Sequence, residues 1–225
     1  YLNTMKDLSY HPINDFEHIS LFAAADSALI VRSDFPANDF KEFIAYAKAN
    51  PGKISAGNNG IGTPGNMSLL VLADRYGFDI KHIPYRGGSA EIGKDMLSGA
   101  IEAAADTFGN THVALVTDGK LKVLALFSEA RSQFLPNVPT IKEQGYDFSA
   151  QVWIGAMAPK GTPRPIIDKL NAAIRQVVSS DYYKEKLAAN AQRAVSSTPE
   201  EFRKIAIDEE AKWRDVIKKY NIVSQ

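Results

Sequence analysis

The fold class of this chain is decided by residues 53–107, KISAGNNGIGTPGNMSLLVLADRYGFDIKHIPYRGGSAEIGKDMLSGAIEAAADT. Short apolar runs alternate here with stretches of helical periodicity: strand-like runs at 53–56, 79–84 and 101–105, and helical patterns at 64–76 and 89–98. Strands that alternate with helices of this length pair in parallel through right-handed crossovers. The stretch therefore predicts an α/β fold.

The same alternation continues on both sides of this stretch. Apolar runs at 19–24 and 28–31 predict one or two buried strands, and Asn38 is expected to cap the helix that follows them. On the far side, a helical pattern at 110–116 precedes an apolar strand at 121–126. We expect residues 27–127 to form a complete lobe built on a parallel sheet.

The C-terminal third is mostly helical. The patterns predict helices at 163–178, 182–189 and 199–220, the last opened by a capping box that starts at Thr198. Their apolar stripes are typical of core packing, and so few strands lie nearby that these helices must pack on a sheet supplied elsewhere. The predicted domains are residues 1–26 as a remnant of a first lobe with its crossover, 27–127 as a second lobe, and 128–225 as a return to the first lobe with the C-terminal helices.

Two turns rich in small residues, at 57–65 and 85–89, lie between the strands and helices of the central stretch. Each leads into a helix start, where unpaired N–H groups and the positive end of the helix dipole attract anions. A small carboxylate or phosphate is the expected guest. The alternative is that both are ordinary connections, because Gly, Asn and Ser are favoured in such turns for capping and positive φ alone.

In an open α/β sheet, ligands bind beyond the carboxyl ends of the strands. The candidate ligand-binding residues at these ends are Asn58, Asn59, Gly60, Thr63, Tyr85, Gly87, Gly88, Asp106 and Thr107. The amides and hydroxyls can donate hydrogen bonds, and the glycines let a ligand approach the backbone. Asp106 has two possible uses of about equal weight, either capping the following helix or contacting the ligand or a water.

Composition excludes several functional classes. Lysine plus arginine and aspartate plus glutamate number 26 each, which argues against nucleic acid or an anionic membrane surface as a partner. There is no cysteine, and the four histidines, at 11, 18, 82 and 112, lack metal-ligand spacing, so neither a metal nor another cofactor is expected. The glycine turns lack a P-loop lysine, and no nucleophile elbow occurs, so no enzyme is predicted.

Several motifs spread along the chain resemble, in order, the solute-binding proteins of tripartite tricarboxylate transporters, also called the Bug family. They are KISAGNNGIGT at 53–63, HIPYRGG at 82–88, PNVPT at 136–140, APKGTP at 158–163 and STPEEF at 197–202. This resemblance implies a periplasmic, two-lobed fold of the type II or Venus-flytrap kind. It also implies that a small carboxylate is passed to membrane permease subunits, with no catalysis.

The resemblance also implies roles for residues. Asn58 to Gly60 and Thr63 stand where the family has a serine- and glycine-rich loop that contacts the ligand carboxylate. Tyr85 to Gly88 match the family's second turn, with arginine in place of the usual lysine. Asp106 matches the family's acidic residue at the end of the following strand. Family members carry further strand, loop and helix units before the position that aligns with Tyr1. We therefore expect an incomplete first lobe, whether as a fragment, a trimmed protein or a chain completed by self-association or by an N-terminal piece.

Three other functions remain open from the residues. An α/β enzyme would need a general base, for which Asp106 is the one candidate. A sensory or regulatory ligand-binding domain could use the same two-lobed fold. The chain could also be a fragment that binds nothing.

Overall fold

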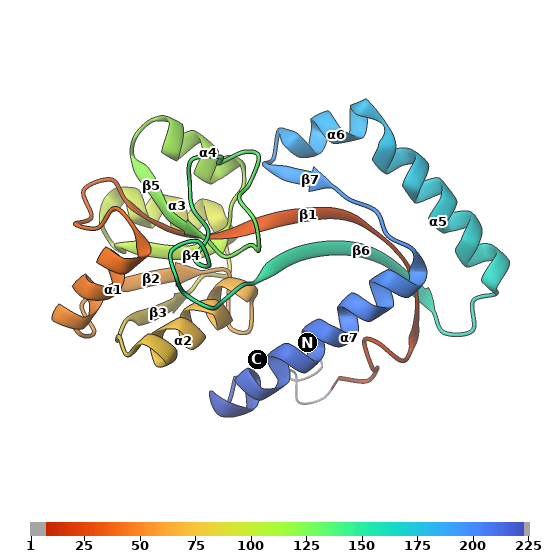
Figure 1. The fold of residues 1–225 in the computed structure, drawn as a ribbon, viewed down its shortest axis with the longest axis horizontal. Helices are drawn as coiled ribbons and strands as arrows, with labels where there is room; N and C mark the ends of the chain where they lie inside the picture. Colours follow the sequence, from red (N-terminus) through yellow and green to blue (C-terminus); the bar gives the residue numbers. More distant parts are fainter. Residues whose placement is uncertain (1–7, 223–225) are drawn as a thin grey trace. The chain divides into compact units, whose positions relative to one another are not determined.

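The computed structural model describes residues 8–222 and forms an α/β fold (Figure 1). Its contacts divide the chain into two units, unit 1 with residues 1–24 and 153–225 and unit 2 with residues 25–152. The elements are β1 (Phe16–Arg32), α1 (Phe40–Ala49), β2 (Ser55–Asn58), α2 (Pro64–Tyr76), β3 (Lys81–Pro84), α3 (Gly88–Ser98), β4 (Ala103–Thr107), α4 (Asn110–Thr117), β5 (Leu121–Leu126), β6 (Gln151–Pro159), α5 (Arg164–Ser179), α6 (Asp181–Ala188), β7 (Gln192–Ala194) and α7 (Pro199–Lys219).

The sheet of unit 2 has the strand order β3-β2-β4-β1-β5. Strand β2 pairs in parallel with β3 and β4, whereas β1 is antiparallel to both β4 and β5. The prediction of an all-parallel sheet over residues 27–127 is therefore wrong for β1, although β2, β3, β4 and β5 all point the same way. The alternation of helices and strands predicts that strands joined by helical crossovers run in parallel. It does not predict that β1, which enters from unit 1, lies between β4 and β5 and runs in the opposite direction.

Strand β1 is one continuous strand of 17 residues rather than two. It runs through the boundary between the units and is buried along most of its length because both of its edges are paired. The helix after it is capped by Asp39, which accepts from the Glu42 N–H at 2.7 Å, and not by Asn38 as predicted. Asn38 instead uses its own backbone N–H to donate to the Glu42 carboxylate at 2.7 Å.

Helix α2 approaches the sheet very closely at Gly65. A Cβ atom built there would lie 2.1 Å from the carbonyl oxygen of Ala105 in β4. Only glycine leaves room for the first turn of the helix to rest on the strand backbone. This contact fixes the start of α2 next to the carboxyl end of β4.

The segment at 128–152 belongs to unit 2, so the boundary predicted after residue 127 differs from the observed division after residue 152. Backbone hydrogen bonds tie this segment to the end of β5: Ile141 N–H donates to Leu126 O at 2.9 Å, and Ala150 N–H donates to Phe127 O at 2.6 Å. The sequence shows little periodicity here because the segment is held by isolated backbone bonds and buried side chains rather than by a regular element. At the other boundary, the predicted segment 1–26 begins with residues 1–7, which lie outside the described range.

Unit 1 contains the first part of β1 with β6 and β7 paired to it, and helices α5, α6 and α7. The buried side chain of Asn171 in α5 donates to the carbonyls of Ile19 and Ser197, both at 2.8 Å. Helix α7 rests on β6 at Gly155, where a Cβ atom would lie 2.5 Å from the ring of Phe202. The capping box predicted at Thr198 is confirmed, with Glu201 as its second member.

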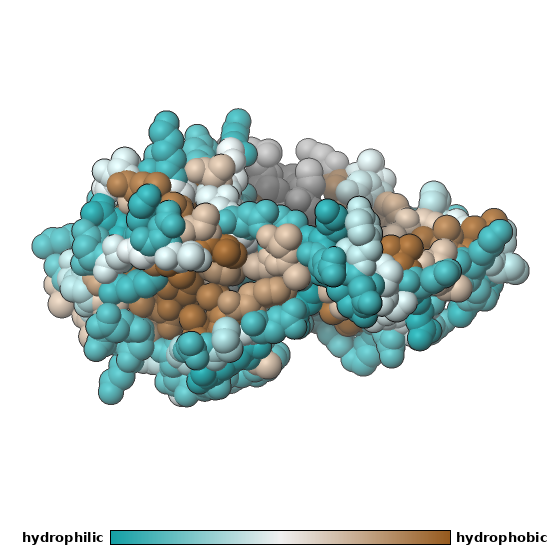
Figure 2. Space-filling view, turned by 90° about the horizontal axis from the view of Figure 1, so that it is seen from above, coloured by the Kyte–Doolittle hydropathy of each residue, from teal (hydrophilic) through white to brown (hydrophobic). Residues whose placement is uncertain are grey.

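Helix α5 buries a narrower face than its apolar stripe predicts. Ile167 and Val178 are buried, but Leu170 is 40% exposed and Val177 54% exposed. Figure 2 shows this hydrophobic surface in brown at the right-hand end, where Figure 1 places α5. None of the helices in the described part of the chain is long and apolar enough to cross a membrane.

Candidate anion site at the ends of three parallel strands

The two glycine turns predicted from the sequence lie at the same end of the sheet in unit 2, beyond the carboxyl ends of its parallel strands. In the parallel register, Asn58 at the end of β2 aligns with Pro84 at the end of β3, and Gly57 aligns with Ala104 in β4. The backbone N–H of Tyr85 donates to the carbonyl of Asn58 at 2.9 Å and joins the turns directly. Adjacent parallel strands end at one edge, so the carboxyl ends of β2, β3 and β4 are neighbours.

Three helices start at this edge, and none of them has a side-chain cap. The N-cap residues are Thr63 for α2, Gly87 for α3 and Gly109 for α4. The side chain of Thr63 does not cap α2, because its hydroxyl donates to the carbonyl of Gly60 at 2.7 Å. Pro64 occupies the first turn of this helix. The first-turn N–H groups of all three helices therefore lack a side-chain acceptor from their own N-cap.

The Asp106 carboxylate joins the strand ends together. Its Oδ1 accepts from the side chain of Asn59 and from the backbone N–H of Thr107, the latter at 2.7 Å. The hydroxyl of Ser89, in the first turn of α3, also bonds to this carboxyl. Capping of α4 by Asp106 is thus wrong, since Gly109 is the N-cap of that helix. Asp106 links β4 to the turns after β2 and β3.

His112 in α4 completes the buried core of this site. Its Nε2 lies 3.4 Å from Oδ2 of Asp106, and both side chains are fully buried. Burial raises the pKa of the Asp106 carboxyl, against the opposing effects of His112 and of the hydrogen bonds from Ser89 and Thr107. Burial likewise lowers the pKa of His112, against the opposing charge of Asp106. Burial therefore favours the uncharged forms of both partners.

Two buried amide atoms at this end of the sheet have no hydrogen-bond partner among the described residues. They are Nδ2 of Asn58 and Oδ1 of Asn59, whereas Oδ2 of Asp106 and Nε2 of His112 face each other at 3.4 Å. Asn58 is fully buried, and its Oδ1 accepts from the Gly60 N–H at 3.1 Å. Buried polar atoms are rarely left without partners in folded proteins. A cluster of them beside three uncapped helix starts is a specific place for a polar ligand or ordered water.

The remaining predicted residues lie around this cluster with different exposure. The hydroxyl of Tyr85 donates to Asp95 in α3 at 2.7 Å, so it is directed into unit 2, and burial raises the pKa of Tyr85 to about 12, with Asp95 adding to the shift. Gly88 has a φ of 70°, and a Cβ atom there would lie 4.0 Å from Oδ1 of Asn59. The N–H of Gly87 donates to Glu91 at 3.0 Å. Whether these residues contact a ligand stays a prediction.

Sequence reasoning placed Ser89 in the candidate turn at 85–89 but not among the candidate ligand-binding residues, and it missed His112. Both approach Asp106 from the first turn of a helix rather than from a strand end, so a search restricted to strand ends does not find them. Their position in the sequence was the signal that could have found them. Each lies in the first turn of a helix that follows a glycine turn or Asp106, and from there its side chain can contact the carboxyl ends of the strands.

Comparison with known proteins identifies the family. The sequence profile of the tripartite tricarboxylate transporter family receptor, TctC, matches residues 2–222. A curated relative from Cupriavidus necator, described as a UPF0065 protein in the gbd 5' region, is 32% identical over 215 residues. That match covers 96% of this chain and 65% of the relative. This chain thus spans just under two thirds of the length of that relative.

Solved structures agree with this result. The Rpa4515 protein of R. palustris, solved with adipate, is 26% identical and superposes with a TM-score of 0.86, covering 98% of this chain and 73% of that one. MatC from Rhodopseudomonas palustris, solved with bound malate, is 25% identical with a TM-score of 0.82, covering 96% of this chain and 74% of the other. The structure of the periplasmic binding protein BugD, 31% identical, also superposes with a TM-score of 0.83, covering 99% of this chain and 75% of that one. The fold is that of these proteins, and about a quarter of the length of each has no counterpart in this chain. The resemblance inferred from the sequence motifs is confirmed, and the chain belongs to the TctC family of tripartite tricarboxylate transporter receptors, the Bug family.

Proposed function

We propose that this chain is the greater part of a periplasmic solute-binding protein that captures a small carboxylate for a tripartite tricarboxylate transporter. Unit 2 acts as the second lobe and unit 1 as part of the first. The carboxylate binds at the edge of the unit 2 sheet, and the membrane permease subunits of the transporter receive it. The carboxylates bound by the two similar R. palustris structures support this ligand class.

The observation that carries the proposal is the set of uncapped starts of α2, α3 and α4 at one sheet edge. A carboxylate placed there accepts hydrogen bonds from first-turn N–H groups and lies at the positive end of the helix dipoles. Each hydrogen bond to a charged group contributes about 1.5–3 kcal/mol. The unpartnered Nδ2 of Asn58 is a further donor at the same edge.

The buried carboxyl of Asp106 fits an anion site because its environment opposes its charge. Burial raises its pKa, so the charged form of Asp106 is less favoured here than in water and its repulsion of a bound carboxylate is easier to relieve. Oδ1 holds Asn59 and Thr107 in place, and Oδ2 faces Nε2 of His112 at 3.4 Å. We assign Asp106 a positioning role, in which it fixes the turn after β2 so that its donors face the ligand.

We propose no catalytic role for this site. The Asp106 and His112 pair is buried, the Ser89 hydroxyl beside it bonds to the Asp106 carboxyl, and no group of three potential metal ligands is found in the described part of the chain. A buried carboxyl that holds neighbouring donors in place is suited to orienting them rather than to exchanging protons with a substrate.

Titration calorimetry with a panel of mono-, di- and tricarboxylates tests the proposal, with this chain and a form extended to the length of its relatives. We expect saturable binding of at least one carboxylate, tighter in the longer form, and roughly tenfold or greater weakening in Asn59→Ala. Asn190→Ala, an asparagine on the surface of unit 1, is the matched control and should bind as the parent does. Equal affinities in Asn59→Ala and the parent would contradict the proposed site.

A further inference from the structure

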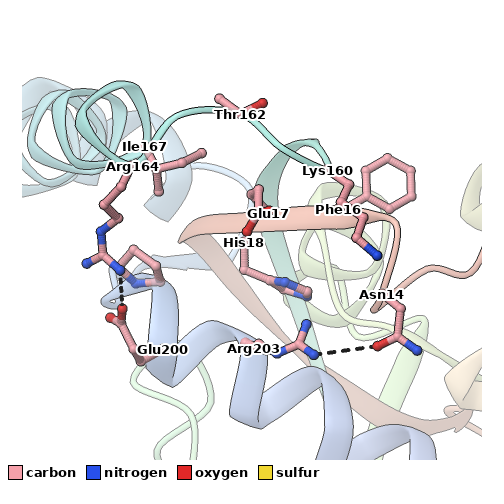
Figure 3. A pocket seen from close by; sticks show the side chains of 11 residues that line it. Asn14, Phe16, Glu17, His18, Lys160, Thr162, Arg164, Ile167, Glu200 and Arg203 are labelled. Carbon is pink, nitrogen blue, oxygen red and sulfur yellow. Dashed lines mark hydrogen bonds and ion pairs between the residues drawn. The ribbon is translucent and has the colours of Figure 1, made fainter.

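Unit 1 contains a polar cavity of about 660 Å³ that the proposed carboxylate site does not use (Figure 3). It lies between the beginning of β1, the end of β6 and the starts of α5 and α7. The lining residues are Asn14, Phe16, Glu17, His18, Lys160, Thr162, Arg164, Ile167, Pro199, Glu200 and Arg203. All of them belong to unit 1, so this cavity is independent of the strand ends in unit 2.

The most unusual member of the cavity is His18. Its side chain is only 4% exposed, yet neither ring nitrogen has a hydrogen-bond partner among the described residues. Its ring packs edge-on against Phe202 with the centroids 4.9 Å apart, which fixes its orientation. Leaving a buried imidazole N–H unpaired costs free energy unless a guest supplies the acceptor. A guest that accepts a hydrogen bond is therefore favoured here.

The charges around His18 indicate the sign of that guest. Arg203 lies close enough that its positive charge contributes to lowering the pKa of His18, after the larger effect of burial, and Figure 3 shows the two groups next to one another. The Arg203 guanidinium donates to the carbonyl of Ile13 at 3.0 Å and has no carboxylate within ion-pair distance in residues 8–222. Lys160 likewise has no ion-pair partner in the described chain. Two cations thus line the cavity without an ion-pair partner among the described residues.

The acidic residues of the cavity are largely engaged with other groups. Glu200 pairs with Arg164 at 2.6 Å, and Arg164 also contacts Asp168 at 2.7 Å. Glu17 accepts from the backbone N–H of Gly161 at 3.2 Å and opposes the lowered pKa of His18. After the Arg164–Glu200 pair is set aside, Lys160 and Arg203 outweigh Glu17 by one positive charge.

Helix α5 adds its positive end to the same cavity. Its N-cap is Pro163, which has no side-chain cap hydrogen bond, and the helix is 16 residues long. Thr162 cannot serve as the cap because its hydroxyl donates to the carbonyl of Pro159 at 2.7 Å. Pro165 has no N–H, and the N–H groups of Ile166 and Ile167 donate to the carbonyl of Pro163, so the start of α5 offers the positive end of its dipole and the single N–H of Arg164.

We propose that this cavity binds a small oxyanion, a phosphate or a carboxylate group, as a second anion site separate from the one in unit 2. Arg203 and Lys160 provide the charge, His18 donates one ring N–H, and the positive end of the α5 dipole adds to the attraction. Such charge-assisted bonds to an oxyanion are the strong ones in proteins. A ligand of this size and charge satisfies the buried nitrogen of His18, which no protein group in the described chain does.

Calorimetric titration with inorganic phosphate at low ionic strength tests this site, and titration with acetate shows whether a carboxylate also binds. Lys160→Gln and Arg203→Gln should each weaken phosphate binding roughly tenfold or more. Lys169→Gln, an exposed lysine of α5 outside the cavity, is the matched control and should bind as the parent does.

Nitrogen NMR of the imidazole gives a second readout that does not depend on the stability of the Arg203 variant. We expect the His18 ring nitrogen signals to move during the phosphate titration and to stay still in Lys160→Gln at the same phosphate concentration. Phosphate binding that is the same in the parent, Lys160→Gln and Arg203→Gln would overturn the proposal. So would weak binding reduced equally by Lys169→Gln, because general surface charge would then explain it.

Discussion

Helices in unit 2 begin in two different ways, depending on the end of the strands at which they start. Helix α1 follows the antiparallel strand β1, whose end at Arg32 aligns with the start of β5, and Asp39 caps it. Helices α2, α3 and α4 begin at the opposite edge without a side-chain cap. In unit 1, α6 and α7 are capped by Ser180 and Thr198. Capping side chains are thus present at the starts of α1, α6 and α7 and absent at the three starts where we propose that an anion binds.

The largest effect is expected where an uncapped helix start touches the sheet. Gly65→Ala places a methyl group 2.1 Å from the backbone carbonyl of Ala105, so the helix or the strand must move. We expect a loss of about 2–3 kcal/mol in the free energy of unfolding, measured by urea denaturation. Gly87→Ala is the control, because its Cβ meets only the flexible end of Glu91, and it should cost much less. Equal losses in both variants would contradict the close approach at Gly65.

A capped helix start should depend on its side chain. Thr198→Ala removes the hydroxyl that accepts from the Glu201 N–H at 3.1 Å and breaks the capping box. We expect a loss of about 1 kcal/mol in urea denaturation. Thr198→Ser keeps the hydroxyl and should retain most of that stability. An unfolding midpoint that is the same in Thr198→Ala and the parent would show that this cap contributes nothing.

The free energy of unfolding should depend on pH through His18 in unit 1 more than through the Asp106 and His112 pair in unit 2. Burial, together with the charge of Arg203 and against that of Glu17, lowers the pKa of His18 below its ordinary value of 6.5. The unfolded chain then binds a proton before the folded one as the pH falls below about 6.5, so acid lowers the free energy of unfolding. The Asp106 and His112 pKa shifts have opposite directions, so their contributions oppose one another.

Urea denaturation at about pH 7.5 and about pH 5.5 measures this contrast. His18→Gln should flatten the loss of stability between the two conditions. The shift of His82 in the same direction, caused by burial, remains in the variant and sets the residual slope. A slope that is unchanged in His18→Gln would mean that the imidazole titrates alike in the folded and unfolded states.

A smaller change converts an uncapped start into a capped one. Gly109 has extended backbone with a φ of −153°, which an aspartate can adopt. Gly109→Asp should stabilise the fold by a few tenths of a kcal/mol, since Asp exceeds Gly only slightly as an N-cap. It should also weaken carboxylate binding, because the new charge occupies the start of α4. Gly109→Asn is the uncharged control, with similar stability and a smaller loss of affinity.

Much of the fold could be predicted because local signals agreed with it. The alternation from 53 to 126 gave the strands and helices of unit 2 to within about two residues, and the Thr198 capping box gave the start of α7. The antiparallel insertion of β1 could not be predicted, because strand direction across a unit boundary depends on pairing partners far away in sequence. Asn38 and Asp39 are adjacent and both able to cap, so the sequence could not choose between them.

Part of the candidate site could also be predicted from the sequence, and part of it could not. Strand ends in a parallel sheet meet at one edge, so Asn58, Asn59 and Asp106 could be grouped from the sequence alone. The hydrogen bond of Tyr85 to Asp95 and the contact between His112 and Asp106 depend on how α3 and α4 pack on the sheet. Such side-chain pairings between elements leave no periodic signal in the sequence.

The most direct test of the account is an amide NMR titration of this chain with adipate or malate. If the uncapped starts form the carboxylate site, saturable shifts should occur at the first-turn amides of α2, α3 and α4, such as Gly65, Ser89 and Thr111. The amides held by caps, those of Glu42, Tyr183 and Glu201, should stay still. Shifts of equal size at capped and uncapped starts, or none at the three uncapped starts at saturating ligand, would contradict the account.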